Sequence, residues 1–503
     1  AEQAGAAGEG GQQAGATAEG AAASDSAAGS SAARDASSAS SSSDESQQDK
    51  SNAPLDPDAA VVRGELLDLL SKQLPAADVE RIKRSVFSMD TFYVTGTAAS
   101  SRFRPDVEAT VFKGNVRTKD LSKLFEGCQQ ALMKEFDDKY VLYMVEQQPE
   151  LDDGASIEEM LMAEEDDDQT RISFVVANRA QVVLETPWWR TLCSVLLLGS
   201  TALTSLQLGA ATSVAKYPEL VKLLSGPDAA TSVIPEETLL ALLDTSLPIA
   251  QGVLAVALAH EFGHRVAAGV HGVELALPLF LPNTQLGTFG AITETKSIIP
   301  SRKAQFDIAA AGPAASFAAG GLLFAYGLLT TGSGAPEDLV PVPSQVFQSS
   351  LAMGLAARAG LGYPAMHQAQ VLVSPELIAG WCALTTAALN VLPVGRIDGG
   401  VMAASALGQG TKTFLGFVTY LGLGFGVFAR PNVSLLWAIY VLALQRQQMA
   451  LCMDEVTEAG DVRATAAVSA LSVALLVLLP IGPELANELG IGLQQDIFPS
   501  DFL

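Results

Sequence analysis

The sequence AHEFGH at residues 259–264 follows directly on the apolar run IAQGVLAVAL at residues 249–258. On a helix, His260 and His264 are four positions apart and lie on one face, so both imidazoles reach one metal ion. Glu261 lies beside this pair, where it is placed to act as a general base on a water molecule at the metal. The pattern predicts a zinc hydrolase.

The apolar surroundings of this motif indicate a membrane site. Ionisable side chains at membrane depth cost about 2.5–3.5 kcal/mol each on insertion scales and are therefore usually functional. Because a span needs about 20 residues, we expect roughly six to eight spans, with residues 376–392 marginal. The apolar segments are 191–214, 239–268, 305–330, 376–392, 411–429, 432–449 and 463–482. Residues 275–292 are apolar but interrupted by proline and glycine, which predicts a re-entrant loop or hairpin.

The composition excludes several classes of protein. The chain has 503 residues, of which 49% are hydrophobic, and its 55 acidic and 30 basic residues give a net charge of −25. Nucleic-acid binding and adhesion to anionic membranes both need a basic surface, so neither is expected. The four cysteines are far apart and form no CxxC pair, which argues against a structural zinc site or a disulfide framework.

The chain divides into segments of different composition. Residues 1–54 form an Ala/Ser-rich acidic tail without large apolar residues and should be disordered. Residues 55–187 predict a small soluble α+β domain, with helices at 61–74, 120–136 and 154–165 and strands at 91–95, 109–112, 140–145 and 171–176. Paired tryptophans and an arginine at 188–190 suit a membrane interface. We therefore expect a membrane domain at 188–485 and a C-terminal tail at 486–503.

A catalytic zinc site needs a third protein ligand, and the best candidate is Asp398. It lies in the sequence NVLPVGRIDGG at residues 390–400. Pro393 disrupts a helix and frees backbone carbonyls, and the glycines let the chain approach a metal closely. Asn390 offers both a donor and an acceptor. A broken helix with Asn and Asp at membrane depth favours a functional role.

HEFGH on an apolar segment followed by a downstream N-x-x-P…DG sequence resembles the site-2 protease family of intramembrane zinc metalloproteases. Further motifs are similar to its plastid and cyanobacterial branch, named EGY in plants. They are FKGNVR at 112–117, GTFGAIT at 287–293, FDIA at 306–309 with AGP at 311–313, and LIAGWC at 377–382. The resemblance extends from about residue 87 to about residue 463.

The resemblance implies a polytopic helical membrane protease that cuts transmembrane segments of protein substrates within the lipid. It implies that His260, His264 and Asp398 bind Zn²⁺ and that Glu261 activates the attacking water. It also implies that Asn390 helps to hold the substrate backbone or the oxyanion. The substrate would add as a strand to the segment formed by Gly287, Thr288, Phe289 and Gly290. The implied location is a chloroplast membrane, the thylakoid, reached by a nuclear-encoded precursor whose transit peptide is removed.

Arg396 departs from the pattern of that branch, which has a small residue at this position. We expect its long side chain to extend to water; a place near the metal or against the substrate is the alternative. A second hypothesis for the whole chain is a membrane scaffold or chaperone-like relative that does not use catalysis. A metal-dependent transporter is weaker, because it leaves the placement of Glu261 unexplained.

Overall fold

The computed structural model describes residues 73–100, 103, 107–146, 172–183, 185–225, 234–429, 437, 439–441 and 450–492. The tail at 1–54 and the helix expected at 154–165 lie outside these residues, as do nearly all of the helix expected at 61–74 and the last residues of the C-terminal tail.

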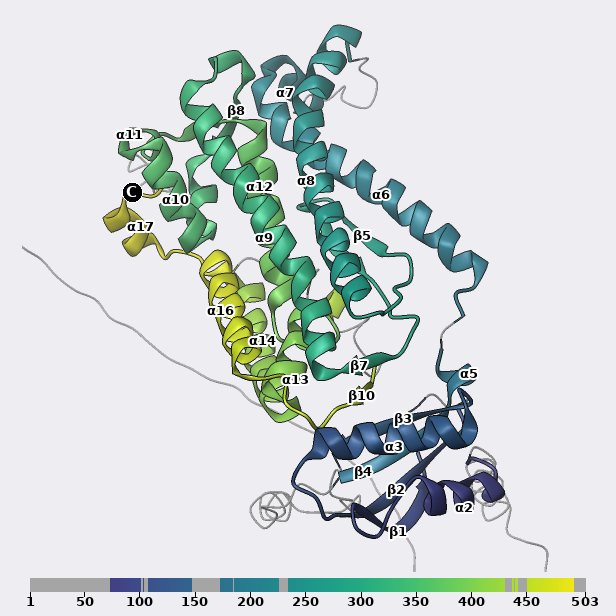
Figure 1. Ribbon diagram of the computed structural model, residues 1–503. Coiled ribbons are helices and arrows are strands. Elements are labelled where there is room, and N and C mark those ends of the chain that lie inside the picture. The colour runs from purple at the N-terminus through teal and green to yellow at the C-terminus, as the bar shows by residue number, and fades with distance from the viewer. Residues whose placement is uncertain are drawn as a thin grey trace, which may run out of the picture. The chain divides into compact units, whose positions relative to one another are not determined.

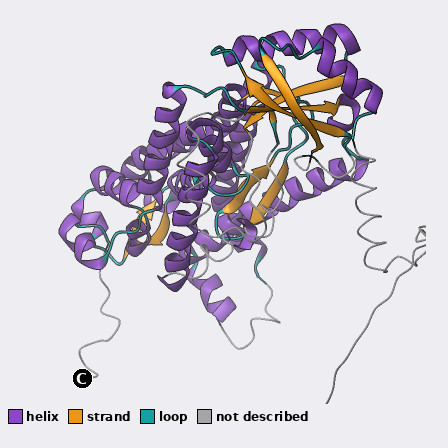
Figure 2. Ribbon diagram, turned by 90° about the horizontal axis from the view of Figure 1, so that it is seen from below, coloured by secondary structure: helices purple, strands orange, loops and turns teal. Residues whose placement is uncertain are grey.

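The N-terminal sheet contains the four strands predicted from the sequence. Its strands are β1 (Phe92–Ala99), β2 (Ala109–Val116), β3 (Tyr140–Glu146) and β4 (Ile172–Asn178), and all neighbours among them pair antiparallel. Helices α2 (Ala76–Ser85) and α3 (Leu121–Phe136) accompany them, as Figure 2 shows. The side chain of Asp120 accepts a hydrogen bond from the Lys123 N–H and so caps α3. Helix α2 was not expected from the sequence.

The sheet is not confined to the segment at 55–187. Two short strands extend it to six, in the order β1-β2-β4-β3-β10-β7, with β7 (Ile299–Ser301) and β10 (Cys452–Asp454). Strand β10 pairs parallel with both β3 and β7. Strands of three residues carry too little pattern to be recognised, and their partners are far away in sequence. All four cysteines are free, in agreement with their spacing.

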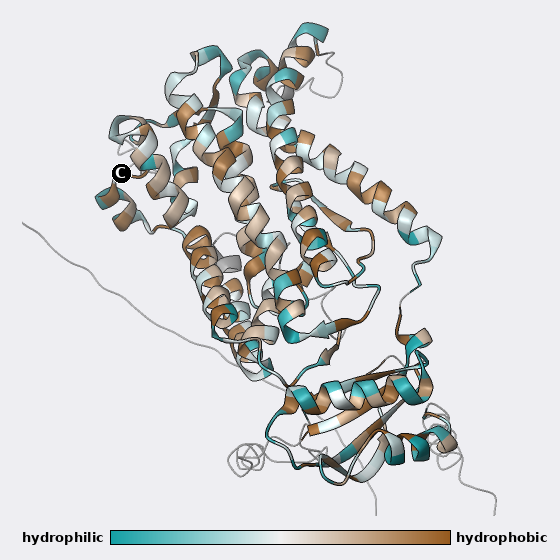
Figure 3. Cartoon of the chain, viewed as in Figure 1, coloured by the Kyte–Doolittle hydropathy of each residue, from teal (hydrophilic) through white to brown (hydrophobic). Residues whose placement is uncertain are grey.

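Among the described residues, four helices are long and apolar enough to cross a membrane. They are α6 (Trp188–Ser213), which continues into η1 (Val214–Lys216), α8 (Glu236–Val270), α9 (Arg302–Ser333) and α16 (Asp461–Leu478). Apolar residues run along these helices in Figure 3. The expected six to eight spans are therefore not confirmed. Helix α14 (Gln409–Ala429) covers the segment expected at 411–429, and most of 432–449 lies outside the described residues.

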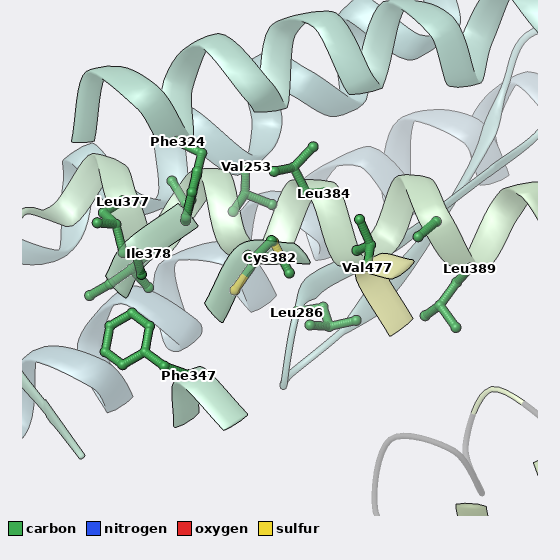
Figure 4. Close-up of a cluster of buried hydrophobic side chains, with 14 of the residues drawn as sticks. Val253, Leu286, Phe324, Phe347, Leu377, Ile378, Cys382, Leu384, Leu389 and Val477 are labelled. Carbon is green, nitrogen blue, oxygen red and sulfur yellow. The ribbon is translucent and has the colours of Figure 1, made fainter. Parts of the chain in front are cut away.

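The marginal segment at 376–392 forms α12 (Pro375–Val391), which has 17 residues and is buried along most of its length. Helices α8, α9 and α12 lie side by side (Figure 1). In Figure 4, Val253 of α8, Phe324 of α9, Leu384 of α12 and Val477 of α16 meet in one apolar cluster. A Cβ on Gly380 would lie 2.5 Å from the Phe324 nitrogen, so this helix contact requires glycine.

Residues 275–292 contain a hairpin, as expected. Strand β5 (Leu279–Asn283) pairs antiparallel with β6 (Gly287–Ile292). Neighbouring helices bond its backbone: the Thr204 hydroxyl donates to the Gly287 carbonyl at 2.7 Å and the Thr386 hydroxyl to the Thr288 carbonyl at 3.0 Å. Irregular backbone among apolar helices is stable only when its polar groups are bonded in this way.

The remaining elements are short. They are α5 (Arg179–Val182), α7 (Pro218–Ser225), η2 (Pro336–Asp338), β8 (Val340–Pro343), η3 (Ser344–Ser349), α10 (Leu351–Leu361), α11 (Tyr363–Met366), β9 (Gln370–Val373), α13 (Asp398–Leu407) and α17 (Pro483–Leu489). Helix α17 crosses the boundary at 485 that we expected for the C-terminal tail.

Candidate active site

Three donor groups from two separate helices meet at one point. His260 and His264 lie on α8, and Asp398 is the first residue of α13. The two Nε2 atoms are 3.0 Å apart. One Asp398 carboxylate oxygen lies 3.1 Å from His260 Nε2 and the other 3.4 Å from His264 Nε2. The structure thus brings the three expected ligands together.

The hydrogen bonding of His264 and the spacing of the three groups suit a bound cation. Its Nδ1 lies 2.7 Å from the Ile308 carbonyl, which can only accept, so Nδ1 carries a proton and Nε2 is the ring nitrogen that faces the cluster. That nitrogen faces the second imidazole nitrogen and a carboxylate, which is the donor set that a zinc ion would bind. Ligand atoms about 2.0–2.1 Å from a tetrahedral zinc ion stand about 3.3 Å apart, which matches the spacing here.

Ser316 and Ile308, both on α9, hold the two rings in place. Ser316 Oγ lies 2.8 Å from His260 Nδ1, and the Ile308 carbonyl accepts from His264. Such partners fix the orientation of a metal-binding imidazole and strengthen it as a ligand. Ile308 lies in the FDIA motif at 306–309, but neither its contact nor that of Ser316 could be predicted, because the two residues lie 44 and 56 positions from their histidines.

Glu261 lies beside the cluster, and two residues hold its carboxylate. The Thr293 hydroxyl donates to Oε2 at 2.7 Å, and the Arg265 guanidinium forms an ion pair with Oε1 at 2.8 Å. The Glu261 side chain is only 7% exposed, so these contacts balance the cost of burying its charge. Thr293 ends the GTFGAIT motif, which was a usable signal, and Arg265 directly follows the HEFGH sequence.

Gly312 allows α9 to approach the metal cluster. A Cβ on Gly312 would lie 2.2 Å from His264 Nε2, and a Cβ on Gly263 of α8 would lie 2.4 Å from the Ala311 carbonyl. Real side chains do not tolerate such distances, so α8 and α9 contact each other through glycine on both sides. This close contact explains why glycine stands in the middle of the AGP motif at 311–313.

We expect Gly312→Ala to lower zinc content and the thermal midpoint together, because the added methyl displaces His264 or separates the helices. Gly321→Ala is the matched control, since a Cβ on Gly321 of the same helix meets nothing within 4 Å. Zinc is measured by elemental analysis of purified protein. Full zinc content in the Gly312 variant would contradict the close contact.

A cavity of about 130 Å³ opens on the cluster. This exceeds the roughly 30 Å³ that one water takes up in the liquid, so water and part of a substrate fit beside the carboxylate. Asn390, Thr293 and Arg396 line the cavity together with His264 and Asp398. Arg396, which was expected to extend to water, is partly exposed and is one of the residues that line this cavity.

Known proteins agree with this site. Residues 248–428 match the model of peptidase family M50, and residues 80–183 match the EGY3 middle domain. The chain is 40% identical over 435 residues to a protein named probable zinc metalloprotease EGY1, chloroplastic, of Oryza sativa subsp. japonica, covering 85% of this chain and 72% of the relative.

The chain belongs to the M50 zinc metalloproteases of the EGY group.

Further relatives of this M50 metalloprotease have the same kind of name. The probable zinc metalloprotease EGY1, chloroplastic, of Arabidopsis thaliana is 40% identical over 437 residues, which cover 85% of this chain and 76% of the relative. The EGY2 protein of Arabidopsis thaliana, also named a probable zinc metalloprotease, is 30% identical over 415 residues, 82% of this chain and 66% of the relative. No solved structure matches the chain. The enzyme is thus a membrane metalloprotease, and zinc is its cofactor.

Proposed function

We propose that this metalloprotease hydrolyses peptide bonds within transmembrane segments of other membrane proteins. The observation that carries the proposal is the meeting of His260, His264 and Asp398 among apolar helices rather than on a water-exposed surface. A protease whose substrates are soluble has no reason to bear the cost of burying these groups between spans. The donor set also favours catalysis over the scaffold hypothesis, which needs no ligand cluster.

His260, His264 and Asp398 would hold the zinc ion, and Glu261 would act as the general base. Bound zinc would polarise the scissile carbonyl and lower the pKa of water to about 7. Glu261 would accept the proton of the attacking water on its carboxylate and pass it to the leaving nitrogen. Thr293 and Arg265 would keep that carboxylate in one orientation during both transfers.

The hairpin β5–β6 supplies the proposed substrate site. A peptide bond within a helix is protected by the hydrogen bonds of the helix, so the substrate must unwind before it is cut. Thr288 and Gly290 of β6 line a second, smaller cavity of about 20 Å³ that His260 also lines. A strand of substrate along β6 would replace the lost helical bonds. Asn390 lines both cavities and would contact the substrate backbone.

The cellular setting is also part of the proposal. The names of the relatives say chloroplastic, and the apolar helices agree with an integral membrane protein of that organelle. Among chloroplast membranes we propose the thylakoid, and we propose a nuclear-encoded precursor from which a transit peptide is removed. Fractionation of chloroplasts with an antibody against residues 1–54 or a C-terminal tag tests the membrane; enrichment in the envelope would contradict it.

Removal of the metal tests the chemistry. We expect a zinc chelator to abolish cleavage of membrane proteins by the protein in liposomes, and added Zn²⁺ to restore it, because two neutral imidazoles and one carboxylate prefer zinc to magnesium or calcium. Zinc content and rate are followed during a titration. Activity that persists after all zinc is gone would contradict the proposal.

Arg396 gives a prediction about the substrate rather than the metal. We expect Arg396→Ser to lower kcat/KM about tenfold, because a guanidinium in the cavity wall can donate to substrate carbonyls, and to leave zinc affinity unchanged. Zinc affinity is measured by competition with a chelator. Tighter zinc binding in the variant would show instead that the cation stands close enough to repel the metal.

A further inference from the structure

The side-chain amide of Asn390 has no hydrogen left to donate. Its Nδ2 donates to the Phe289 carbonyl at 3.1 Å and to the Thr386 carbonyl at 3.0 Å. An amide nitrogen has two hydrogens, and both partners are carbonyls that only accept, so the chemistry fixes this orientation. Asn390 is 6% exposed. In this state it cannot also donate to a substrate carbonyl or an oxyanion.

The Phe289 carbonyl belongs to the part of β6 that has no partner on β5. Phe280 pairs with Ala291 and Pro282 pairs with Thr288, and the register shifts between them, which leaves Phe289 and Gly290 unpaired. Gly290 has φ +103°, and a Cβ there would lie 2.7 Å from Asn390 Nδ2. The bulge and its glycine therefore bring this carbonyl and the Asn390 amide together.

We infer that Asn390 occupies a hydrogen-bond position on β6 that the substrate takes over. This rests on the proposed addition of a substrate strand to β6. A substrate N–H would bond the Phe289 carbonyl, and the released Asn390 N–H would turn to the scissile carbonyl oxygen. Each group exchanges one hydrogen bond for another, so no buried polar group loses its partner. The terminal torsion of an Asn side chain is soft enough for this turn.

The exchange makes catalysis depend on an unwound substrate. In an intact substrate helix each backbone N–H is bonded to the carbonyl of the residue four positions earlier. No N–H is then free to displace Asn390. An extended segment presents such an N–H, and only then does the Asn390 amide reach the reacting carbonyl. The enzyme would thus complete its site after the substrate has become a strand, as in induced fit.

The Asn390→Ala variant distinguishes the proposed hydrogen-bond exchange from a role in which Asn390 only holds the substrate. The probe is an extended tetrapeptide hydroxamate, which ligates zinc through the hydroxamate and can add to β6 through its backbone. Because the substitution leaves the Phe289 carbonyl free, we expect the probe's Kd to be equal or several-fold lower. We expect cleavage of reconstituted chloroplast membrane proteins to be about 10²–10³-fold slower, since a donor to the oxyanion is lost. A Kd more than tenfold higher would overturn the exchange.

Thr386→Val is the matched comparison. It removes a different hydrogen bond between α12 and β6, the one from the Thr386 hydroxyl to the Thr288 carbonyl. The two backbone carbonyls that accept from Asn390 are unchanged. A general loosening of β6 should appear in both variants. An equal loss of cleavage rate in Thr386→Val would overturn a special role for Asn390.

The structure of zinc-loaded Glu261→Gln with a bound tetrapeptide hydroxamate tests the exchange without a variant at Asn390. We expect a peptide nitrogen within hydrogen-bond distance of the Phe289 oxygen, and Asn390 Nδ2 turned away from it. A peptide seated on β6 while Asn390 still donates to Phe289 would overturn the exchange alone. A peptide at the metal but not on β6 would overturn the proposed strand addition as well.

Discussion

Glu261→Gln is expected to lower the rate of proteolysis by about 10²–10⁴ while zinc content remains that of the unchanged protein. The substitution keeps the size of the side chain and removes only its ability to accept a proton. Glu261 is not one of the three groups that meet at the metal point, so its loss should not release the ion. Elemental analysis of the purified protein and cleavage of membrane proteins in liposomes are measured on the same preparations.

His264→Ala is the contrasting variant. It removes one of the three donor groups and should lose zinc and activity together, because the remaining imidazole and carboxylate form only a partial site. If both variants lost zinc to the same extent, Glu261 would be a ligand or a structural residue, and its assignment as general base would be wrong.

Gly399→Ala should be the most damaging of the glycine substitutions near the site. A Cβ on Gly399 would lie 2.0 Å from the Val391 carbonyl oxygen and 2.5 Å from the Leu392 oxygen. Both obstacles are backbone, so α13 must move away from the end of α12, and Asp398 moves with it. We expect loss of zinc and a loss of stability of about 1–3 kcal/mol or more, measured as zinc content and thermal midpoint.

Gly410→Ala serves as the control, because a Cβ on Gly410 meets nothing within 4 Å. It lies inside α14, where alanine is a better helix former than glycine, so stability should be equal or slightly higher. A Gly399 variant that keeps both zinc and stability would contradict the close contact of the α12–α13 turn that we describe.

Much of this fold follows from local sequence patterns. The apolar runs at 109–112 and 140–145 predict strands that are present, and the prolines and glycines of 275–292 predict a re-entrant loop or hairpin in place of a span, of which the structure has the hairpin. Helical spacing puts His260 and His264 on one face. These features depend on residues close together in the chain, where period and turn chemistry decide the outcome.

Contacts between distant segments could not be predicted in this way. No period links Ser316 to His260, or the Ile308 carbonyl to His264, and the three-residue strand β10 joins β3 only once the chain has folded. The number of spans could not be predicted for a related reason. Helix α12 is apolar because protein surrounds it, and apolar composition alone does not distinguish burial in protein from burial in lipid.

The position of the cut tests the central claim most directly. Purified protein and its Glu261→Gln variant are placed in liposomes with chloroplast membrane proteins, and new N-termini are identified by mass spectrometry. We predict new termini inside apolar transmembrane segments that require both zinc and Glu261. Termini confined to soluble loops, or the same termini with the variant, would contradict intramembrane proteolysis at this site.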